Sequence, residues 1–174
     1  MLGLLPTGAG KSICYQVPGL FFGGITLVVS PLIALIKDQV EQLRKVGVNS
    51  QSIHAGMAKI EIDAILNGCI HDETVQFLFV SPERLHSKLF LERLGFMNVT
   101  FLVIDEAHCI SQWGYDFRPL YLKISQVIKR FKNQSIPILA LTASATPDVQ
   151  KDIIDKLELG KDVFVYKGEF SREN

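Results

Sequence analysis

Short blocks of apolar residues alternate with longer amphipathic stretches along this chain. Five blocks are nearly continuous, four to six residues long and rich in branched or aromatic side chains: 2–5, 26–29, 75–80, 101–104 and 136–141. Such runs are typical of strands that are buried on both faces of a parallel sheet. A weaker candidate strand covers residues 162–166.

The stretches between these blocks have helical periodicity. Apolar residues recur at offsets of three and four within 32–46, 62–70, 120–131 and 149–157, which predicts amphipathic helices. The last helix has a clear start signal, with Thr146 as N-cap, Pro147 at the first helical position and Asp148 in the first turn. A further helix is expected after Lys11, and Pro18 predicts that it kinks or ends there.

Strands that alternate with helices predict an α/β fold. We expect three layers, with a mainly parallel central sheet between two layers of helices. The 174 residues suffice for one domain with a sizeable core, and the sequence contains no internal repeat, low-complexity tract or linker. A single domain over residues 1–174 is therefore predicted.

The composition narrows the class of protein. Hydrophobic residues make up 48% and charged residues 21%, as in soluble globular proteins. No apolar run approaches the roughly 20 residues that span a bilayer, and no basic segment leads into an apolar one at the N-terminus. We expect an intracellular protein, in the cytoplasm or nucleoid of a bacterium or the nucleus of a eukaryote. Cys14, Cys69 and Cys109 have no metal-binding spacing and are expected to be buried free thiols.

The charges balance, with 18 basic and 18 acidic side chains. A protein that holds nucleic acid by diffuse counterion release usually carries a basic surplus. Any contact with nucleic acid must therefore be made by a few placed groups, and composition alone does not suggest DNA.

Polar and turn-forming residues follow each of the five strong blocks. They are residues 6–12 (PTGAGKS), 30–32 (SPL), 81–84 (SPER), 105–108 (DEAH) and 142–146 (TASAT). In an open parallel sheet, ligands bind outside the carboxyl ends of the strands. These five segments are therefore the predicted functional residues.

The first segment is typical of a phosphate-binding loop. Gly8 and Gly10 let successive backbone N–H groups face one point, at the positive end of the following helix. Lys11 supplies a charge for the outer phosphates of ATP, and Ser12 offers a hydroxyl to Mg²⁺. The residues predicted to bind ATP are Pro6, Thr7, Gly8, Ala9, Gly10, Lys11 and Ser12. Leu5 stands where the general pattern has glycine, and the alternative is a glycine-rich turn with a surface lysine.

The acidic segment supplies the other half of a hydrolytic site. Asp105 is predicted to hold Mg²⁺, usually through water, and Glu106 to orient and deprotonate the attacking water. For His108 we favour a sensor at the γ-phosphate over a packed polar residue. The predicted catalytic residues are thus Lys11, Asp105, Glu106 and His108. The alternative for the acidic pair alone is a charge at a helix N-terminus.

Residues 105–119 (DEAHCISQWGYDFRP) resemble RecQ ATP-dependent DNA helicases, which belong to superfamily 2 and carry a DEAH box. Residues 6–18, 30–39 and 80–85 also resemble RecQ segments, and the similarity spans at least Leu4 to Asp148. The resemblance implies the RecA-like first motor domain of a helicase that translocates 3′ to 5′ using Mg²⁺ and ATP, with roles in DNA repair and recombination. The implied partners are single-stranded DNA, duplex junctions and a second RecA-like domain.

In this family an aromatic-rich loop after the acidic box links DNA binding to hydrolysis. The resemblance makes Trp113, Phe117 and Arg118 DNA contacts and Gln112 a relay of nucleotide state, and aromatic faces and a guanidinium suit such contacts. The alternative is that both aromatics belong to the core. Further residues implied in DNA binding or coupling are Ser30, Lys37, Ser81, Arg84, Thr142, Ser144 and Thr146. For Lys37 and Arg84 the alternative is a solvated helix charge.

The chain departs from the family pattern at Tyr115, where many members have His, and at Ser144, where many have Thr. We expect the adenine-reading glutamine motif and the arginine finger of the second motor domain to lie outside this sequence. The chain alone should therefore bind nucleotide weakly, hydrolyse it poorly and fail to unwind duplex. Rival functions are a DEAH-box RNA helicase and a small P-loop kinase or other metabolic nucleotide-binding protein. A non-enzymatic scaffold is the least favoured.

Overall fold

A seven-stranded sheet forms the centre of the protein in a computed structural model that describes residues 1–6, 10–131, 136–160 and 162–168. Every strand pairing is parallel, and the strand order is β3-β4-β2-β5-β6-β1-β7. The strands are β1 (Leu2–Leu4), β2 (Ile25–Val29), β3 (Ser50–Ile53), β4 (Phe77–Val80), β5 (Val99–Ile104), β6 (Ile138–Thr142) and β7 (Val165–Lys167). The predicted α/β fold with a parallel sheet is confirmed.

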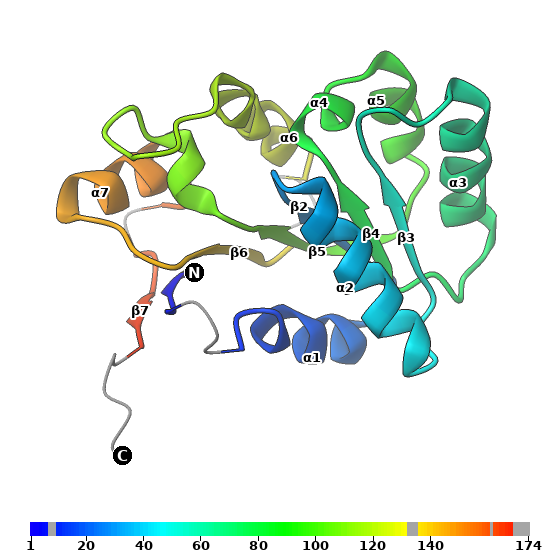
Figure 1. Ribbon diagram of the computed structural model, residues 1–174, viewed down its shortest axis with the longest axis horizontal. Coiled ribbons are helices and arrows are strands. Elements are labelled where there is room, and N and C mark those ends of the chain that lie inside the picture. Colours follow the sequence, from blue (N-terminus) through cyan, green and yellow to red (C-terminus); the bar gives the residue numbers. More distant parts are fainter. Residues whose placement is uncertain (7–9, 132–135, 161, 169–174) are drawn as a thin grey trace.

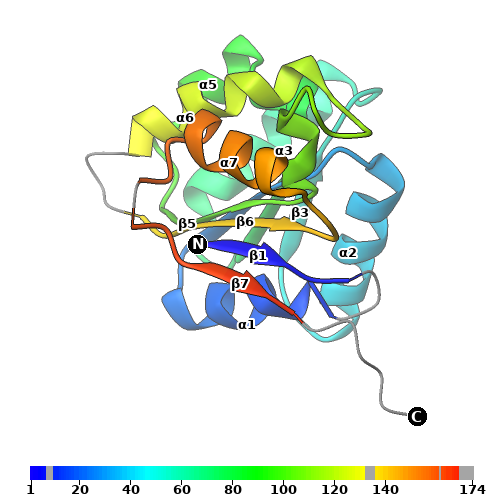
Figure 2. The same ribbon diagram turned by 90° about the vertical axis from the view of Figure 1, so that its left-hand side faces the viewer.

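Helices cover both faces of this sheet (Figures 1 and 2). One face carries α1 (Ile13–Phe22) and α2 (Ile33–Lys45). The other carries α3 (Lys59–His71), α4 (Pro82–Leu85), α5 (Lys88–Leu94), α6 (Ile124–Phe131) and α7 (Pro147–Lys156), with the 3₁₀ helices η1 (Ala107–Ile110) and η2 (Pro119–Lys123). In the described ranges, no helix has the length and apolar character to cross a membrane.

The sheet separates two apolar cores. Leu27 and Val29 of β2 pack in the core shared with α3, α5, α6 and α7, whereas Val28 between them packs with Tyr15 of α1 and Ile36 of α2. Successive side chains of a strand point to opposite faces, so a strand covered on both sides must be apolar throughout. This requirement explains the continuous apolar blocks of the sequence.

Four elements were not predicted, namely β3, α4, α5 and the 3₁₀ helix η1. β3 has the sequence SQSI and lies at the edge of the sheet, where it pairs only with β4, so it lacks the continuous apolar pattern of an inner strand. Of the two alternatives predicted at Pro18, a kink or an end of the helix, the end is wrong, because α1 continues to Phe22. Tyr15 and Gly19 are buried against the sheet on either side of Pro18, and this packing compensates for the backbone hydrogen bond that proline cannot donate.

The predicted start of α7 is confirmed. Thr146 is the N-cap, and its hydroxyl oxygen accepts a hydrogen bond of 3.4 Å from the backbone N–H of Val149. Thr146→Ala should therefore lower the free energy of unfolding by about 1 kcal/mol, whereas Thr146→Ser keeps the acceptor and should lower it much less. Chemical denaturation of both variants measures the difference. Equal stabilities for the Ala and Ser variants would contradict the capping role.

Candidate active site

The parallel sheet brings the predicted segments to a single edge. In sheet order they follow β4 (residues 81–84), β2 (30–32), β5 (105–108), β6 (142–146) and β1 (6–12). Thr7, Gly8 and Ala9 of the predicted phosphate loop lie outside the described residues, whereas Pro6, Gly10, Lys11 and Ser12 are described. Because the carboxyl ends of parallel strands share one edge, the predicted convergence follows directly from the topology.

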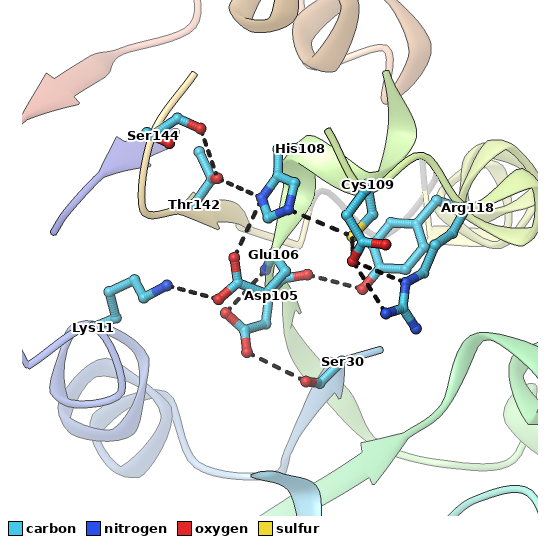
Figure 3. A network of polar contacts seen from close by, with 11 residues as sticks. Lys11, Ser30, Asp105, Glu106, His108, Cys109, Arg118, Thr142 and Ser144 are labelled. Carbon is cyan, nitrogen blue, oxygen red and sulfur yellow. Dashed lines mark hydrogen bonds and ion pairs between the residues drawn. The ribbon is translucent and has the colours of Figure 1, made fainter. Parts of the chain in front are cut away.

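Lys11 and Glu106 meet at the centre of this edge (Figure 3). The Lys11 Nζ lies 2.8 Å from Glu106 Oε1, although 95 residues separate them in the chain. Lys11 is placed there by the start of α1, where the N–H of Ile13 donates to the Gly10 carbonyl and that of Cys14 to the Lys11 carbonyl. The predicted phosphate loop and the acidic segment are therefore in direct contact through Lys11 and Glu106.

Glu106 occupies an unusual backbone conformation. Its φ of 48° and ψ of 46° lie in the left-handed region, which residues other than glycine rarely adopt. The side chain contacts His108 Nδ1 at 3.3 Å as well as Lys11. The hydrogen bond from His108 and the contact with Lys11 hold the pKa of Glu106 at about 2. Its carboxylate is therefore fully ionised near neutral pH.

Asp105 is a buried carboxylate held by neutral donors. The Ser30 hydroxyl donates to Oδ2 (3.3 Å), and the backbone N–H of Glu106 donates to Oδ1 (3.0 Å). Tyr121 fixes the backbone here, because its hydroxyl donates to the Asp105 carbonyl oxygen at 3.0 Å. Burial, and then the charge of Glu106, raise the pKa of Asp105 above its usual range.

These surroundings fit a divalent cation at Asp105. A cation would offset the burial of the carboxylate and the repulsion from Glu106 that together raise its pKa, and carboxylate and hydroxyl oxygens are the ligands that Mg²⁺ prefers. Ser12 occupies the N-cap position of α1 without a side-chain capping bond, so its hydroxyl is not committed to the helix end. The assignment of Ser12 and Asp105 to Mg²⁺ remains a prediction.

His108 connects the acidic segment to the segment after β6. The imidazole is buried, and its Nδ1 lies 2.8 Å from the Thr142 hydroxyl oxygen. That hydroxyl donates its own hydrogen to the Ser144 carbonyl (3.2 Å), so it accepts from His108 and Nδ1 carries the proton. His108 is therefore packed and polar, and it also contacts the catalytic candidate Glu106. The sensor role remains a prediction.

The aromatic-rich loop lies beside this network. Trp113 is 79% exposed, which excludes a place in the core, while Gln112 is exposed and Phe117 half-buried. Tyr115 stacks on His108 with ring centroids 4.6 Å apart and an interplanar angle of 21°. The ring contact places the loop directly against the catalytic candidates.

Arg118 anchors the far end of the loop. Its guanidinium pairs with Asp116 at 3.1 Å and donates to the Pro31 carbonyl at 3.1 Å. Arg118 thereby ties the loop to the segment after β2. The predicted contact of Arg118 with DNA remains a prediction, and its side chain is 35% exposed.

The other predicted DNA residues have varied surroundings. Lys37, Ser144 and Thr146 are exposed, whereas Ser81 is buried. Arg84 donates to the carbonyl oxygens of His54 (3.1 Å) and Met57 (3.0 Å), so it fixes the turn after β3 rather than extending freely into solvent. Roles of these residues in DNA binding remain predictions.

Several residues of the site were not found from the sequence. Tyr121 and Asp116 are two of them, and a third is Asp152 of α7, which accepts from the Ser111 hydroxyl at 2.7 Å and pairs with Lys156 at 2.9 Å. Lys156 also donates to the Ile110 carbonyl at 3.4 Å. The Asp152–Lys156 spacing of four is a visible sequence signal for a helical ion pair. Nothing in the sequence places this pair beside η1.

Comparison with known proteins settles the family. The family described as DEAD/DEAH box helicase matches residues 1–153. The chain belongs to this family. It is 47% identical over 171 residues to the ATP-dependent DNA helicase RecQ of Bacillus subtilis and 43% identical over 177 residues to the ATP-dependent DNA helicase Q-like 4B of Arabidopsis thaliana. Each alignment covers 98% of this chain but only 28% and 15%, respectively, of those proteins. The resemblance to RecQ helicases is thus confirmed.

Solved structures agree with the fold of this helicase domain. The helicase domain of Hef from Pyrococcus furiosus superposes with a TM-score of 0.72 at 21% identity, covering 96% of this chain and 34% of that one. A hypothetical ATP-dependent RNA helicase from Sulfolobus tokodaii gives a TM-score of 0.67 at 20% identity, over 96% of this chain and 47% of that one. At such identities the likeness concerns the fold alone, and it agrees with the predicted three-layer α/β fold.

Proposed function

We propose that this domain is the first motor domain of a RecQ-like DNA helicase that couples hydrolysis of Mg²⁺-ATP to 3′ to 5′ translocation and unwinding. The observation that carries the proposal is the contact of Lys11 with Glu106, next to Asp105 and His108. Phosphoryl transfer needs a phosphate-binding lysine, a metal-binding carboxylate and a water-orienting group in one place. The relatives that match nearly the whole chain are named DNA helicases, which supports DNA as the substrate.

Each residue has a defined task in this proposal. Gly10, Lys11 and Ser12, with the rest of the loop, bind the phosphates, and Asp105 and Ser12 hold Mg²⁺. When bound, Mg²⁺ neutralises charge that develops on the phosphates. A phosphate that draws Lys11 away removes one of the two contacts that lower the pKa of Glu106, so Glu106 becomes a stronger base. Nucleotide binding thus activates the base.

The aromatic-rich loop connects the proposed DNA contact to this base. Trp113 is exposed and suited to stacking on a base. Two residues farther along, Tyr115 stacks on His108, which contacts Glu106. Movement of the loop on DNA would therefore alter the surroundings of Glu106. The proposed partners are single-stranded DNA, duplex junctions and a second RecA-like domain that supplies the arginine finger.

The test compares nucleic acids as activators of ATP hydrolysis in the longer protein that we propose contains this domain. Single-stranded DNA should stimulate hydrolysis, and RNA of the same length should do so much less. Stronger stimulation by RNA would identify an RNA helicase instead, and phosphoryl transfer to a small acceptor without any nucleic-acid effect would identify a kinase. The 174-residue chain alone should bind Mg²⁺-ATP weakly and separate no duplex. Robust unwinding by this chain would contradict that part of the proposal.

A further inference from the structure

The imidazole of His108, the thiol of Cys109 and the carboxylate of Asp116 lie close together, next to the acidic pair Asp105 and Glu106. His108 Nε2 lies 3.8 Å from Cys109 Sγ, and Cys109 Sγ lies 3.6 Å from Asp116 Oδ2. The three possible ligand atoms all lie within 4.8 Å of one another. Figure 3 shows Cys109 between His108 and Arg118, the partner of Asp116. The cluster uses the imidazole nitrogen that faces away from Glu106.

The distances are close to those of a tetrahedral zinc site. Zinc binds thiolate sulfur at about 2.3 Å and imidazole nitrogen or carboxylate oxygen at about 2.0–2.2 Å, so adjacent ligand atoms lie roughly 3.4–3.6 Å apart. The His108–Cys109 and Cys109–Asp116 separations of 3.8 and 3.6 Å nearly match these values. The ligand atoms of His108 and Asp116 would have to approach each other by about 1.4 Å at most. Asp116 lies on the loop with its side chain 43% exposed, which gives it room to move.

The surroundings also orient the three ligands. Nδ1 of His108 donates toward Thr142 and Glu106, which leaves the lone pair of Nε2 directed at Cys109. Histidines that bind metals commonly donate their other N–H to a carboxylate in this way. Asp116 Oδ2, the oxygen nearest Cys109, also accepts from Arg118 Nε (3.2 Å) and Nη2 (3.1 Å). An ion there therefore requires the carboxylate to turn, so that Oδ1 takes over the contact with Arg118, and the Arg118 charge lowers the affinity of the site.

The thiol proton is the group that an ion would replace. Burial, and then the charge of Asp116, raise the pKa of Cys109 to about 12, so the thiol is protonated and donates to Asp116. A divalent cation between sulfur, nitrogen and carboxylate oxygen would take the position of that proton, which would leave to solvent. The exposed side of Asp116 provides the path of entry.

We propose that His108, Cys109 and Asp116 form a binding site for a thiophilic divalent cation such as Zn²⁺, distinct from the Mg²⁺ position at Asp105. Solvent would complete the coordination on the exposed side. An ion there would fix the His108 imidazole and join η1 to the aromatic-rich loop. Binding depends only on these three side chains. Failure of the cation site would therefore not count against the proposed helicase function, and failure of that function would not count against the site.

Cobalt is a suitable probe because Co²⁺ accepts the same ligands as Zn²⁺ and reports a thiolate ligand by its charge-transfer absorption. Titration of the 174-residue chain should give one equivalent of bound Co²⁺ with a thiolate band, and Zn²⁺ should displace it. Cys109→Ser should abolish the band, and Asp116→Asn should weaken binding at least about tenfold. Cys14→Ser and Cys69→Ser are matched controls, one at an exposed and one at a buried free cysteine, and both should keep the band.

Several results would overturn the site. They are a thiolate band that survives in Cys109→Ser, a band that disappears in Cys14→Ser, and the absence of any band in the wild-type chain. The circular dichroism spectrum shows whether Cys109→Ser is folded. If it is not, Asp116→Asn decides the question, because Asp116 is partly exposed and asparagine preserves its size: unchanged cobalt affinity in this variant would also refute the proposal.

Discussion

Glu106→Gln should remove most ATP hydrolysis while leaving Mg²⁺-ATP binding in place. The amide keeps the size of the side chain but cannot accept a proton from water, and loss of a general base typically lowers kcat by about 10²–10⁴-fold. Lys11 loses its ion-pair partner in this variant and is then free to bind phosphate, so affinity for nucleotide should not fall. Steady-state hydrolysis and equilibrium binding by the longer protein separate the two effects.

Glu41→Gln is the matched control for this experiment. Glu41 of α2 also pairs with a lysine, Lys45, at 2.7 Å, but its side chain is 66% exposed and it belongs to none of the five segments at the edge of the sheet. Its replacement should leave hydrolysis unchanged. If Glu106→Gln hydrolysed ATP at the wild-type rate, Glu106 would be only the counter-ion of Lys11, and the base would have to be sought elsewhere.

Trp113→Ala should uncouple hydrolysis from DNA. Stacking of a base on an aromatic side chain contributes about 1–3 kcal/mol, so the DNA concentration needed for half-maximal stimulation should rise roughly five- to hundredfold. The exposure of Trp113 means that the truncation removes little packing from the fold. The measurement is ATP hydrolysis of the longer protein as a function of single-stranded DNA concentration.

Phe96→Ala provides the comparison for Trp113→Ala. Phe96 is another highly exposed aromatic residue, but it precedes β5, at the opposite edge of the sheet from the strand ends that carry the site. Its loss should not change DNA stimulation. A Trp113→Ala variant stimulated at the wild-type DNA concentration would show that this side chain does not contact DNA, and the loop would lose its proposed role.

The inner part of the fold could be predicted from the sequence because both faces of the sheet are covered. Blocks such as 101–104 are apolar at every position for that reason, and they reappear as β5 and its neighbours. β3 could not be found in this way, since Ser50 and Ser52 alternate with other residues along an edge strand. The weaker block at 162–166 corresponds to β7, the other edge.

The contact of Lys11 with Glu106 was predictable because each follows a strand of one parallel sheet. Contacts that depend on the path of a loop could not be predicted from the sequence. Tyr121 reaches the Asp105 carbonyl only because η2 turns back over η1, and no periodicity records that turn. Similarly, cysteine spacing could not indicate the cluster at Cys109, because its other two members are a histidine and an aspartate.

The left-handed backbone at Glu106 has a consequence for evolution and design. An L-residue held in this region costs about 1–2 kcal/mol relative to glycine, so a turn shaped only for stability would carry glycine at position 106. Glycine, however, could supply neither a partner for Lys11 nor a proton acceptor. At position 106, glycine would therefore favour stability and glutamate would favour catalysis. A search for stabilised variants that accepted Glu106→Gly would remove the proposed catalytic base.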